Sequence, residues 1–362
     1  MKLLYDIYEK VKAEKRIDKE QGIRLFQSND LQVIGEMANL VRERLNGNNA
    51  YYIINRHINY TNICKNRCSF CAYSKDEGDN GAWTLTIDQI MEKAKDSDKM
   101  GVKELHIVGG LNPNLPFEYY LKMLCELRRA FPEISLQAFT AVEIHHLAQI
   151  TNLSIEEVLK QLKQAGLTAI PGGGAEVFSE RVHSQICPKK IDGSTWLKIM
   201  EIAHSLGIKS NATMLYGHIE TIEERIEHLL ALRDLQDRTE GFKSFIPLAY
   251  HPENTELGGV GTTGYSDLKT LAISRILLDN FPHIKAFWIM LGVKLAQISL
   301  SFGVDDLDGT VVEERITHSA GAQTPQELTV EQLRNFIKEA GRTPVERDTL
   351  YNRVGKTIGV RP

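Results

Sequence analysis

Apolar positions recur at helical spacing near the start of the chain and at strand spacing beyond it. One helix face carries the apolar residues Leu31, Ile34, Met37, Ala38 and Val41. Ser28 or Asn29 is expected to cap this helix and Gly47 to end it, because short polar residues favour helix starts and glycine favours helix ends. We therefore expect residues 1–50 to form a helical segment that covers one end of the domain that follows.

From residue 51 onwards, short apolar or β-branched runs alternate with longer amphipathic segments. The runs predict strands at residues 51–60, 104–109, 135–140, 168–171, 209–216, 243–250, 285–290 and 304–308. The intervening segments predict helices near residues 86–100, 116–131, 154–165, 194–206, 221–236, 266–281 and 291–302. Strands that alternate with helices in this way are typical of a parallel sheet.

About eight strand–helix units predict an α/β protein with a (β/α)8 TIM-type barrel. The barrel is expected over residues 51–310, and a C-terminal extension packed on it over residues 311–362. The extension carries a helix near residues 329–340 that ends at Gly341. A doubly wound open sheet has similar local patterning and remains the alternative.

The composition indicates the cellular compartment of the protein and the kinds of partner it is expected to lack. The 362 residues include 43 Lys+Arg and 47 Asp+Glu, which gives a net charge of −4 and no basic field for nucleic acid. No apolar run reaches about 18 residues, and the charged N-terminus lacks the apolar core of a signal peptide, so no membrane partner is expected. There are 5 cysteines, too few for a secreted disulfide scaffold, and the cytoplasm is the expected compartment.

Residues able to carry chemistry recur just after the expected strands. A TIM-type barrel places its site at the C-terminal ends of its strands. These ends are followed by Cys64, Cys68 and Cys71, by Gly109 and Gly110, by Thr140 and Glu143, by residues 172–176, by residues 217–220, and by residues 250–254. We therefore expect one functional site on this face of the barrel.

The most specific motif is the loop Cys64-Lys-Asn-Arg-Cys68-Ser-Phe-Cys71. Three thiolates in a short loop can converge on one soft metal centre. A structural zinc site normally needs a fourth ligand, but the other two cysteines, Cys125 and Cys187, are isolated in the sequence. We expect both of them to be packed in the core. A [4Fe–4S] cluster held by three cysteines leaves one iron open. A zinc loop remains the alternative.

This loop resembles the signature of the radical S-adenosylmethionine (SAM) superfamily. The resemblance implies a [4Fe–4S] cluster on Cys64, Cys68 and Cys71 whose open iron binds the amino and carboxylate groups of SAM. It also implies cleavage of SAM to a 5′-deoxyadenosyl radical, and an electron donor such as flavodoxin or ferredoxin. Phe70 resembles the aromatic residue that lies near the adenine in this superfamily, although an ordinary packed phenylalanine fits as well.

Glycine and acidic motifs supply further candidates for SAM binding. Gly109 and Gly110 allow a close approach of the backbone and resemble a Gly-Gly-Glu element that receives the methionine amino group, but Leu111 stands at the acidic position. Glu176, after a triple glycine, is a candidate acceptor for the ribose hydroxyls. Gly217 and Glu220 resemble an element that cradles adenine.

Charged and imidazole residues near these motifs are further candidates. Arg181, Lys189 and Lys190 are candidates to pair with a carboxylate, with a solvated surface role as the alternative for each. His218 and His251 are of interest because they follow expected strands.

Longer segments resemble the aminodeoxyfutalosine synthase family within this superfamily. They comprise residues 106–111, 138–144, 171–176, 211–221, 245–249, 251–255, 308–314 and 344–352. Two positions depart from the family, because Asn112 and Gln137 stand where a histidine is expected.

The resemblance implies an enzyme that adds the 5′-deoxyadenosyl radical to the enol-ether double bond of 3-[(1-carboxyvinyl)oxy]benzoate. The products would be 6-amino-6-deoxyfutalosine, methionine and bicarbonate, in menaquinone biosynthesis, with SAM as co-substrate. Candidate contacts to this aromatic carboxylate are Thr140, Glu143, Tyr250, His251 and Asn254. The alternatives are a cyclic dehypoxanthinyl futalosine synthase of the same pathway and a non-catalytic iron–sulfur or zinc protein.

Overall fold

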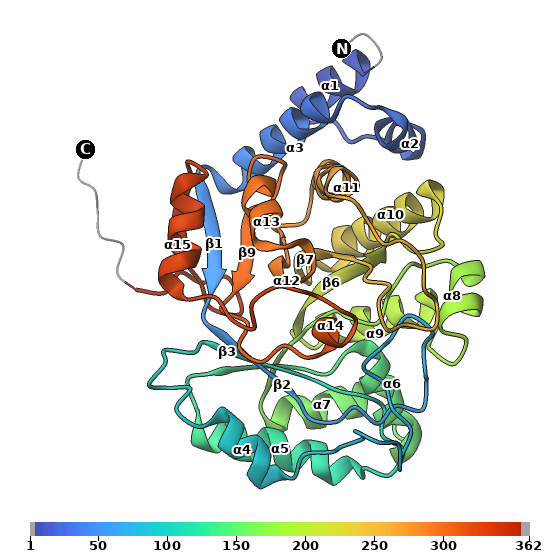
Figure 1. Cartoon of the computed structure of the whole chain (residues 1–362), viewed down its shortest axis with the longest axis vertical. Coiled ribbons are helices and arrows are strands. Elements are labelled where there is room, and N and C mark those ends of the chain that lie inside the picture. The colour runs from blue at the N-terminus through green and yellow to red at the C-terminus, as the bar shows by residue number, and fades with distance from the viewer. Residues whose placement is uncertain (1–3, 356–362) are drawn as a thin grey trace.

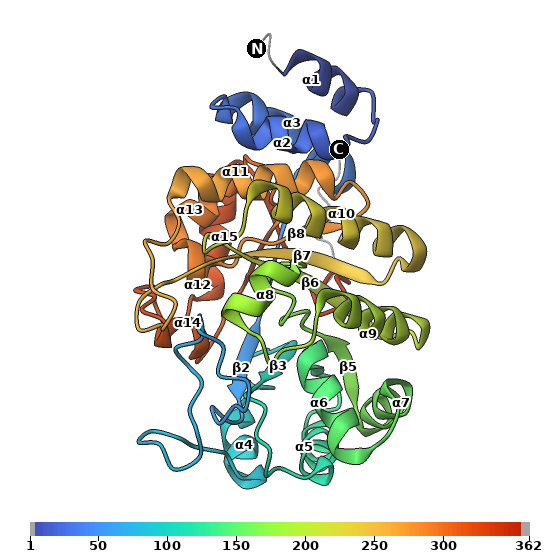
Figure 2. The same ribbon diagram turned by 90° about the vertical axis from the view of Figure 1, so that its right-hand side faces the viewer.

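A curled parallel sheet forms the centre of the molecule, and helices surround it (Figures 1 and 2). The computed structural model describes residues 4–355. The strands pair in parallel in the order β2-β3-β4-β5-β6-β7-β8. Their bounds are β2 Asn55–Asn59, β3 Glu104–Val108, β4 Ser135–Ala138, β5 Leu167–Ile170, β6 Lys209–Tyr216, β7 Phe242–Ala249 and β8 His283–Ile284.

The segment that begins with β9 (Asp306–Gly309) fills the place between the first and the last strand of this sheet. Lys285, directly after β8, forms an isolated parallel β-bridge with Asp306. Arg56 of β2 forms another with Val312. The sheet and this segment together occupy the eight positions of a TIM-type barrel. The predicted α/β barrel is therefore confirmed, and the open doubly wound sheet is not formed.

A second parallel sheet, of order β10-β1-β9, lies beside the barrel. Here β1 (Asn49–Ile53) pairs with β9 and with β10 (Thr343–Glu346). The single strand predicted over residues 51–60 is therefore wrong, because it is two strands in two sheets that break at Ile54. The pattern misses this break because no glycine or proline separates the two halves, and only their partner strands differ.

The strand predicted at residues 285–290 is also wrong. The chain leaves the sheet after Ala286, and α12 (Trp288–Leu291) follows at once. The indole of Trp288 donates a hydrogen bond to the Gly309 carbonyl oxygen at 2.9 Å, which holds this helix against β9. A short apolar run has no period that distinguishes a strand from a buried helix, so the sequence alone does not settle it.

Helices fill the gaps between strands as predicted. They are α4 Ile87–Ala94, α5 Phe117–Ala130, α7 Ile155–Ala165, α9 Gly193–Ser205, α10 Ile222–Thr239, α11 Gly264–Leu277 and α13 Val293–Ser299. The helices α6 Ala141–Thr151, α8 Glu180–Ile186 and α14 Ile316–Ser319 are not predicted. For α6 the reason is that most of its residues before Ala148 are buried, so its sequence shows no polar face. No helix among residues 4–355 is long and apolar enough to cross a membrane.

The N-terminal segment is helical as expected, with α1 Tyr5–Lys12, α2 Lys19–Gln27 and α3 Leu31–Asn46. It packs on the outer helices of the barrel, α3 on α11 and α2 on α10, rather than over a barrel end (Figure 2). Gly47 ends α3 as predicted, but the cap is Asp30, whose carboxylate accepts a hydrogen bond from Val33 N.

The C-terminal region packs on the barrel through α15 (Val330–Glu339) and β10. Beyond β10, Arg347 forms a buried ion pair with Asp306, and the Tyr351 ring stacks on His283 at 3.6 Å between centroids. The Thr349 carbonyl accepts a hydrogen bond from Lys243 inside the barrel. The boundaries expected at residues 50 and 310 remain predictions, and residues 356–362 of the expected extension lie outside the described part.

Candidate active site

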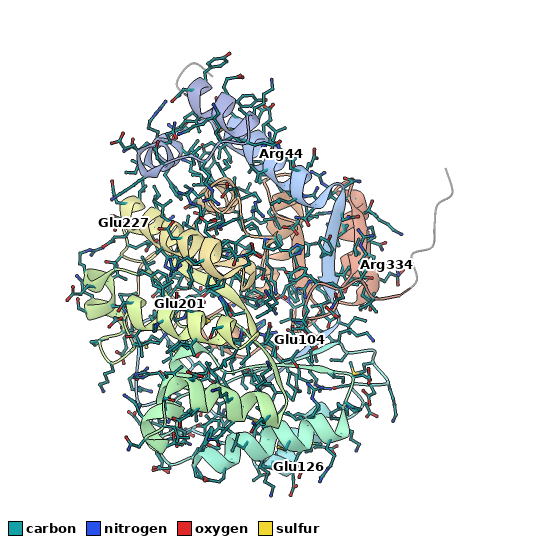
Figure 3. All side chains as sticks on the ribbon, turned by 180° about the vertical axis from the view of Figure 1, so that it is seen from behind. Arg44, Glu104, Glu126, Glu201, Glu227 and Arg334 are labelled. Atoms are coloured by element: carbon teal, nitrogen blue, oxygen red, sulfur yellow. The ribbon has the colours of Figure 1, made fainter. Side chains whose placement is uncertain are left out.

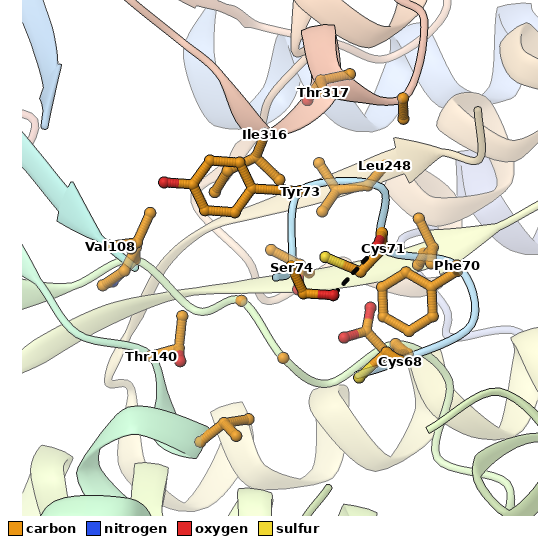
Figure 4. A pocket seen from close by; sticks show the side chains of 18 of the residues that line it. Cys68, Phe70, Cys71, Tyr73, Ser74, Val108, Thr140, Leu248, Ile316 and Thr317 are labelled. Atoms are coloured by element: carbon orange, nitrogen blue, oxygen red, sulfur yellow. Dashed lines mark hydrogen bonds between the residues drawn. The ribbon is translucent and has the colours of Figure 1, made fainter. Parts of the chain in front are cut away.

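The C-terminal ends of the strands surround a cavity of about 340 Å³. The loop between β2 and α4 contributes Cys64, Cys68, Phe70 and Cys71 to its lining. Figure 4 shows Cys68, Phe70 and Cys71 gathered on one side of this pocket, with Val108 of β3 across from them. Its size and its mixture of apolar and polar lining suit a small-molecule site.

Backbone hydrogen bonds hold the cysteine loop in place. Cys71 N donates to the Cys68 carbonyl at 2.9 Å, and Cys64 N donates to the Lys75 carbonyl at 3.0 Å. Ser69 N donates to the Ile186 carbonyl at 2.9 Å, which joins the loop to the end of α8. Burial raises the pKa of the Cys68 thiol to about 12 and also raises the pKa of Cys71.

The chemistry of these donors fits an iron–sulfur cluster. Cys64, Cys68 and Cys71 are free thiols that face one cavity, and three thiolates are the ligand set of a cluster with one open iron. Among residues 4–355, no group of three or more His, Cys, Asp or Glu side chains is arranged so that it could hold a metal ion as the side chains stand. Cys187 is buried, as expected, whereas Cys125 is exposed on α5, so its predicted place in the core is wrong.

Gly110 brings the end of β3 against the cysteine loop. A Cβ at this position would lie 2.2 Å from the Ile63 carbonyl oxygen and 3.0 Å from Cys64 Cβ, so only glycine fits. Gly110 N also donates to the Thr61 carbonyl at 2.9 Å. The backbone of Gly109 is in contact with the Tyr60 ring, which a Cβ there would approach to 2.7 Å.

Thr140 and Glu143 form the capping box of α6 and line the same cavity. The Glu143 carboxylate accepts hydrogen bonds from the Tyr60 hydroxyl at 2.6 Å, from Gly109 N at 3.2 Å and from Thr140 N at 2.7 Å. Burial raises the pKa of Glu143. The geometry gives Glu143 a positioning task, because it ties β3 to α6 beside the cysteine loop.

Lys190 lies between Glu176 and the cysteine loop and interacts with both Glu176 and Cys68. The Glu176 carboxylate forms an ion pair with Lys190, and the Lys190 ammonium lies 5.1 Å from the centroid of the Phe70 ring. Although burial opposes it, the Glu176 carboxylate raises the pKa of Lys190. The structure thus brings Phe70, Glu176 and Lys190 together at the cysteine loop. Arg181 instead pairs with Glu224, at 2.6 Å.

Gly217 and Glu220 do not line this cavity in the described part of the chain. The Glu220 side chain is fully buried and accepts hydrogen bonds from Gly217 N at 2.6 Å, His218 N at 2.9 Å and Arg225 Nε at 2.7 Å. His218 is used in the same turn, with Nε2 3.0 Å from the Leu215 carbonyl. Local hydrogen bonding in the turn therefore accounts for this motif.

Tyr250 and His251 line the cavity, whereas Asn254 does not. The Tyr250 hydroxyl donates to the Gly258 carbonyl at 2.9 Å, and His251 Nε2 lies 2.9 Å from the Met290 carbonyl. Asn254 points outward and donates to the Ser319 carbonyl at 3.2 Å. Gln137 and Asn112, the two departures from the family pattern, also lie outside the lining.

A set of polar side chains deep in the cavity was not predicted. We call it the polar floor, and it consists of His57, His106, Lys285, Asp308 and Glu314. The rings of His57 and His106 stack at 4.4 Å between centroids, and Lys285 pairs with Asp308 at 2.9 Å. Charged and imidazole residues inside expected strands are the signal that could have revealed all of its members except Glu314, which lies in the expected C-terminal extension.

Glu314 of the polar floor is paired with His318, which makes part of the stability depend on pH. The hydrogen bond to Glu314 raises the pKa of His318 to about 9. This stabilisation is complete below the unfolded pKa of about 6.5 and is lost as the pH rises through the folded value. As the pH rises from about 6.5 to about 9, the free energy of unfolding measured in urea should fall less in His318→Gln than in the wild type. An unchanged profile in both His318→Gln and Glu314→Gln would contradict the pairing.

Comparison with known proteins agrees with this geometry. A family model described as the radical SAM superfamily matches residues 58–232, and one described as the CofH/MqnC C-terminal region matches residues 239–357. The chain is 49% identical to an aminodeoxyfutalosine synthase of Thermus thermophilus, over 97% of this chain and 96% of the relative. It is 43% identical to an aminodeoxyfutalosine synthase of Streptomyces coelicolor, over 99% of this chain and 95% of the relative.

Other relatives carry a different name. A 5-amino-6-(D-ribitylamino)uracil–L-tyrosine 4-hydroxyphenyl transferase of Methanococcoides burtonii is 40% identical, over 93% of this chain and 95% of the relative. Among solved structures, methylornithine synthase PylB matches with a TM-score of 0.74 at 16% identity, over 93% of this chain and 96% of that one. The hydrogenase maturase HydG matches with a TM-score of 0.75 at 18% identity, over 95% and 76%. At these low identities, the similarity to the two solved structures shows a shared fold only.

Proposed function

Because the chain belongs to the radical SAM superfamily, we propose that it catalyses the addition of the 5′-deoxyadenosyl group of SAM to 3-[(1-carboxyvinyl)oxy]benzoate. With water, the reaction gives 6-amino-6-deoxyfutalosine, methionine and bicarbonate for menaquinone biosynthesis. The chain is an enzyme and its substrate is a small molecule, as the superfamily implies. The two relatives called aminodeoxyfutalosine synthase support the choice of reaction.

One observation about the site carries the proposal. A single cavity joins the cysteine loop at the strand ends to the polar floor inside the strands. The same cavity is lined by a group of apolar side chains that we call the apolar belt, which comprises Val108, Leu215, Ile246, Leu248 and Phe287. This lining suits a reaction that joins a nucleoside to an aromatic acid, because the ring can lie in the belt.

Cys64, Cys68 and Cys71 would hold the [4Fe–4S] cluster. When bound, the cluster supplies the electron that cleaves the S–C5′ bond of SAM. The Gly109–Gly110 backbone would approach the methionine part of SAM, and Phe70 and Glu176 would contact its adenosine part. An electron donor such as flavodoxin or ferredoxin, and the cytoplasm as a compartment that keeps these thiols reduced, belong to the same proposal.

The other residues of the cavity orient the substrate and exclude water. The apolar belt surrounds the reacting carbons, which limits the access of water and of stray hydrogen donors. Thr140, Tyr250 and His251 line the wall beside it. Their hydrogen bonds to the protein keep these side chains fixed, as positioning of the two reactants requires.

An anaerobic assay tests this function. The reconstituted protein should bind iron and sulfide and, with a chemical reductant, convert SAM and 3-[(1-carboxyvinyl)oxy]benzoate into the nucleoside adduct, identified by mass spectrometry. Dehypoxanthinyl futalosine, and 5-amino-6-(D-ribitylamino)uracil with L-tyrosine, serve as rival substrates. Turnover of either rival without adduct formation would refute the proposal, and tight zinc binding without a cluster would refute the family chemistry.

A further inference from the structure

We propose that the polar floor binds the benzoate carboxylate of the substrate through Lys285 and His57, an inference that rests on the proposed function. No hydrogen-bonding partner within residues 4–355 occupies His57 Nε2. The His57 side chain lines the cavity and is 6% exposed, and its Nε2 is a buried polar atom of that ring. A buried ring nitrogen without a partner is costly unless a ligand satisfies it.

The position of the floor sets the depth at which a carboxylate would bind. His57 of β2 and His106 of β3 are register partners, two residues before Asn59 and Val108 at the strand ends. Two residues along a strand correspond to about 7 Å. Along β2 and β3 the two imidazoles therefore lie below Val108 of the apolar belt, while the cysteine loop begins above the strand ends.

Lys285 supplies the cationic donor. Its ammonium lies 2.9 Å from Asp308 Oδ1, and the side chain is buried at the cavity wall. An ammonium has three N–H donors, and among the described residues Asp308 accepts from it. Asp308 thus acts as a positioning residue that holds Lys285 in the cavity, where further N–H groups can meet an anion.

The acidic groups of the floor do not oppose this binding as free charges. Asp308 is paired with Lys285, and Glu314 accepts hydrogen bonds from Thr317 N at 2.9 Å and from the His318 ring at 3.1 Å. Glu104, which lies deeper and near the middle of the molecule in Figure 3, accepts a hydrogen bond from Gln137 at 3.1 Å. Recognition therefore rests on the donors His57 and Lys285.

The chemistry of the substrate decides which of its two carboxylates reaches the floor. The enol-ether carboxylate is attached to the carbon pair that reacts, so it must stay near the cysteine end. The benzoate carboxylate is separated from that carbon pair by the ring. With the ring between Val108 and Leu248, which both face the pocket in Figure 4, the benzoate end points to the floor.

The test compares the acid with an uncharged analogue. Reconstituted wild-type enzyme should prefer 3-[(1-carboxyvinyl)oxy]benzoate to the corresponding benzamide. In Lys285→Met, kcat/KM for the acid should fall by about 10- to 100-fold, the cost of losing a hydrogen bond to a charged group. The fall should lie mainly in KM for the acid, with KM for SAM and turnover of the benzamide nearly unchanged.

Two variants separate recognition from folding. Lys285→Met removes the nearer cation of the buried Asp308 and leaves Arg347 Nη2 at 4.0 Å from it, so Lys285→Met/Asp308→Asn repeats the test without the carboxylate charge. Lys198→Met, at an exposed position of α9, is the matched control and should keep the wild-type preference. If the acid preference survives in both Lys285 variants while the wild type forms the adduct, the carboxylate site is refuted and the proposed function still stands. If wild type forms no adduct, the proposed function fails and the inference with it.

Discussion

Replacing Cys68 with alanine should abolish the cleavage of SAM and leave the barrel folded. The alanine removes one of the three thiol groups that face the cavity, and two thiolates do not hold a cluster with one open iron. The Cys68 side chain is small and lies in a loop outside the strands, so the far-UV circular dichroism spectrum should match the wild type. The measurement is the yield of 5′-deoxyadenosine from SAM with dithionite, together with the iron and sulfide content.

Cys125→Ala is the matched control for this experiment. Cys125 is exposed on α5 and does not line the cavity, so its loss should change neither the cluster content nor the turnover. Cys64→Ala and Cys71→Ala should behave like Cys68→Ala. Retained SAM cleavage in Cys68→Ala would show that Cys68 is not a ligand.

The cysteine loop and the barrel were predictable because both are encoded locally. The spacing of Cys64, Cys68 and Cys71 is a property of eight consecutive positions, and each strand–helix unit shows its own pattern. The break at Ile54 was not predictable because no glycine or proline marks it, and the helix at Trp288 was not because a short apolar run fits either a strand or a buried helix. The local hydrophobic pattern of the sequence thus predicts most helices and strands, but it does not predict which strands pair with each other.

The polar floor was missed for a related reason. His57, Lys285 and Glu314 are far apart in the sequence, and only the closure of the barrel through residues 306–312 brings them together. At Glu220 a strand-end carboxylate predicts a ligand contact, and in the structure this carboxylate accepts hydrogen bonds from Gly217 N and His218 N of its own turn. Which strand-end groups are free is decided by hydrogen bonds that no spacing reveals.

Gly110→Ala should have the second largest effect, through the backbone alone. The new Cβ would lie 2.2 Å from the Ile63 carbonyl oxygen and 2.8 Å from its carbon, so the backbone before Cys64 must move. Such overpacking costs about 1–3 kcal/mol, and a shift of about 1 Å at a reacting centre can lower the rate about 100-fold. We therefore expect turnover to fall about 100-fold, with a lower cluster content after reconstitution.

Gly264→Ala tests whether any added methyl group has this effect. A Cβ at Gly264, in the first turn of α11, meets Leu295 at 3.5 Å, an ordinary contact, so turnover should stay at the wild-type level. Thermal unfolding of both variants separates a global loss of stability from a local shift. If Gly110→Ala retains full cluster content and full turnover, then the contact between β3 and the cysteine loop does not set the position of Cys64. If instead cluster content falls while the unfolding transition stays cooperative, the close approach at Gly110 is what aligns the loop with the strand ends.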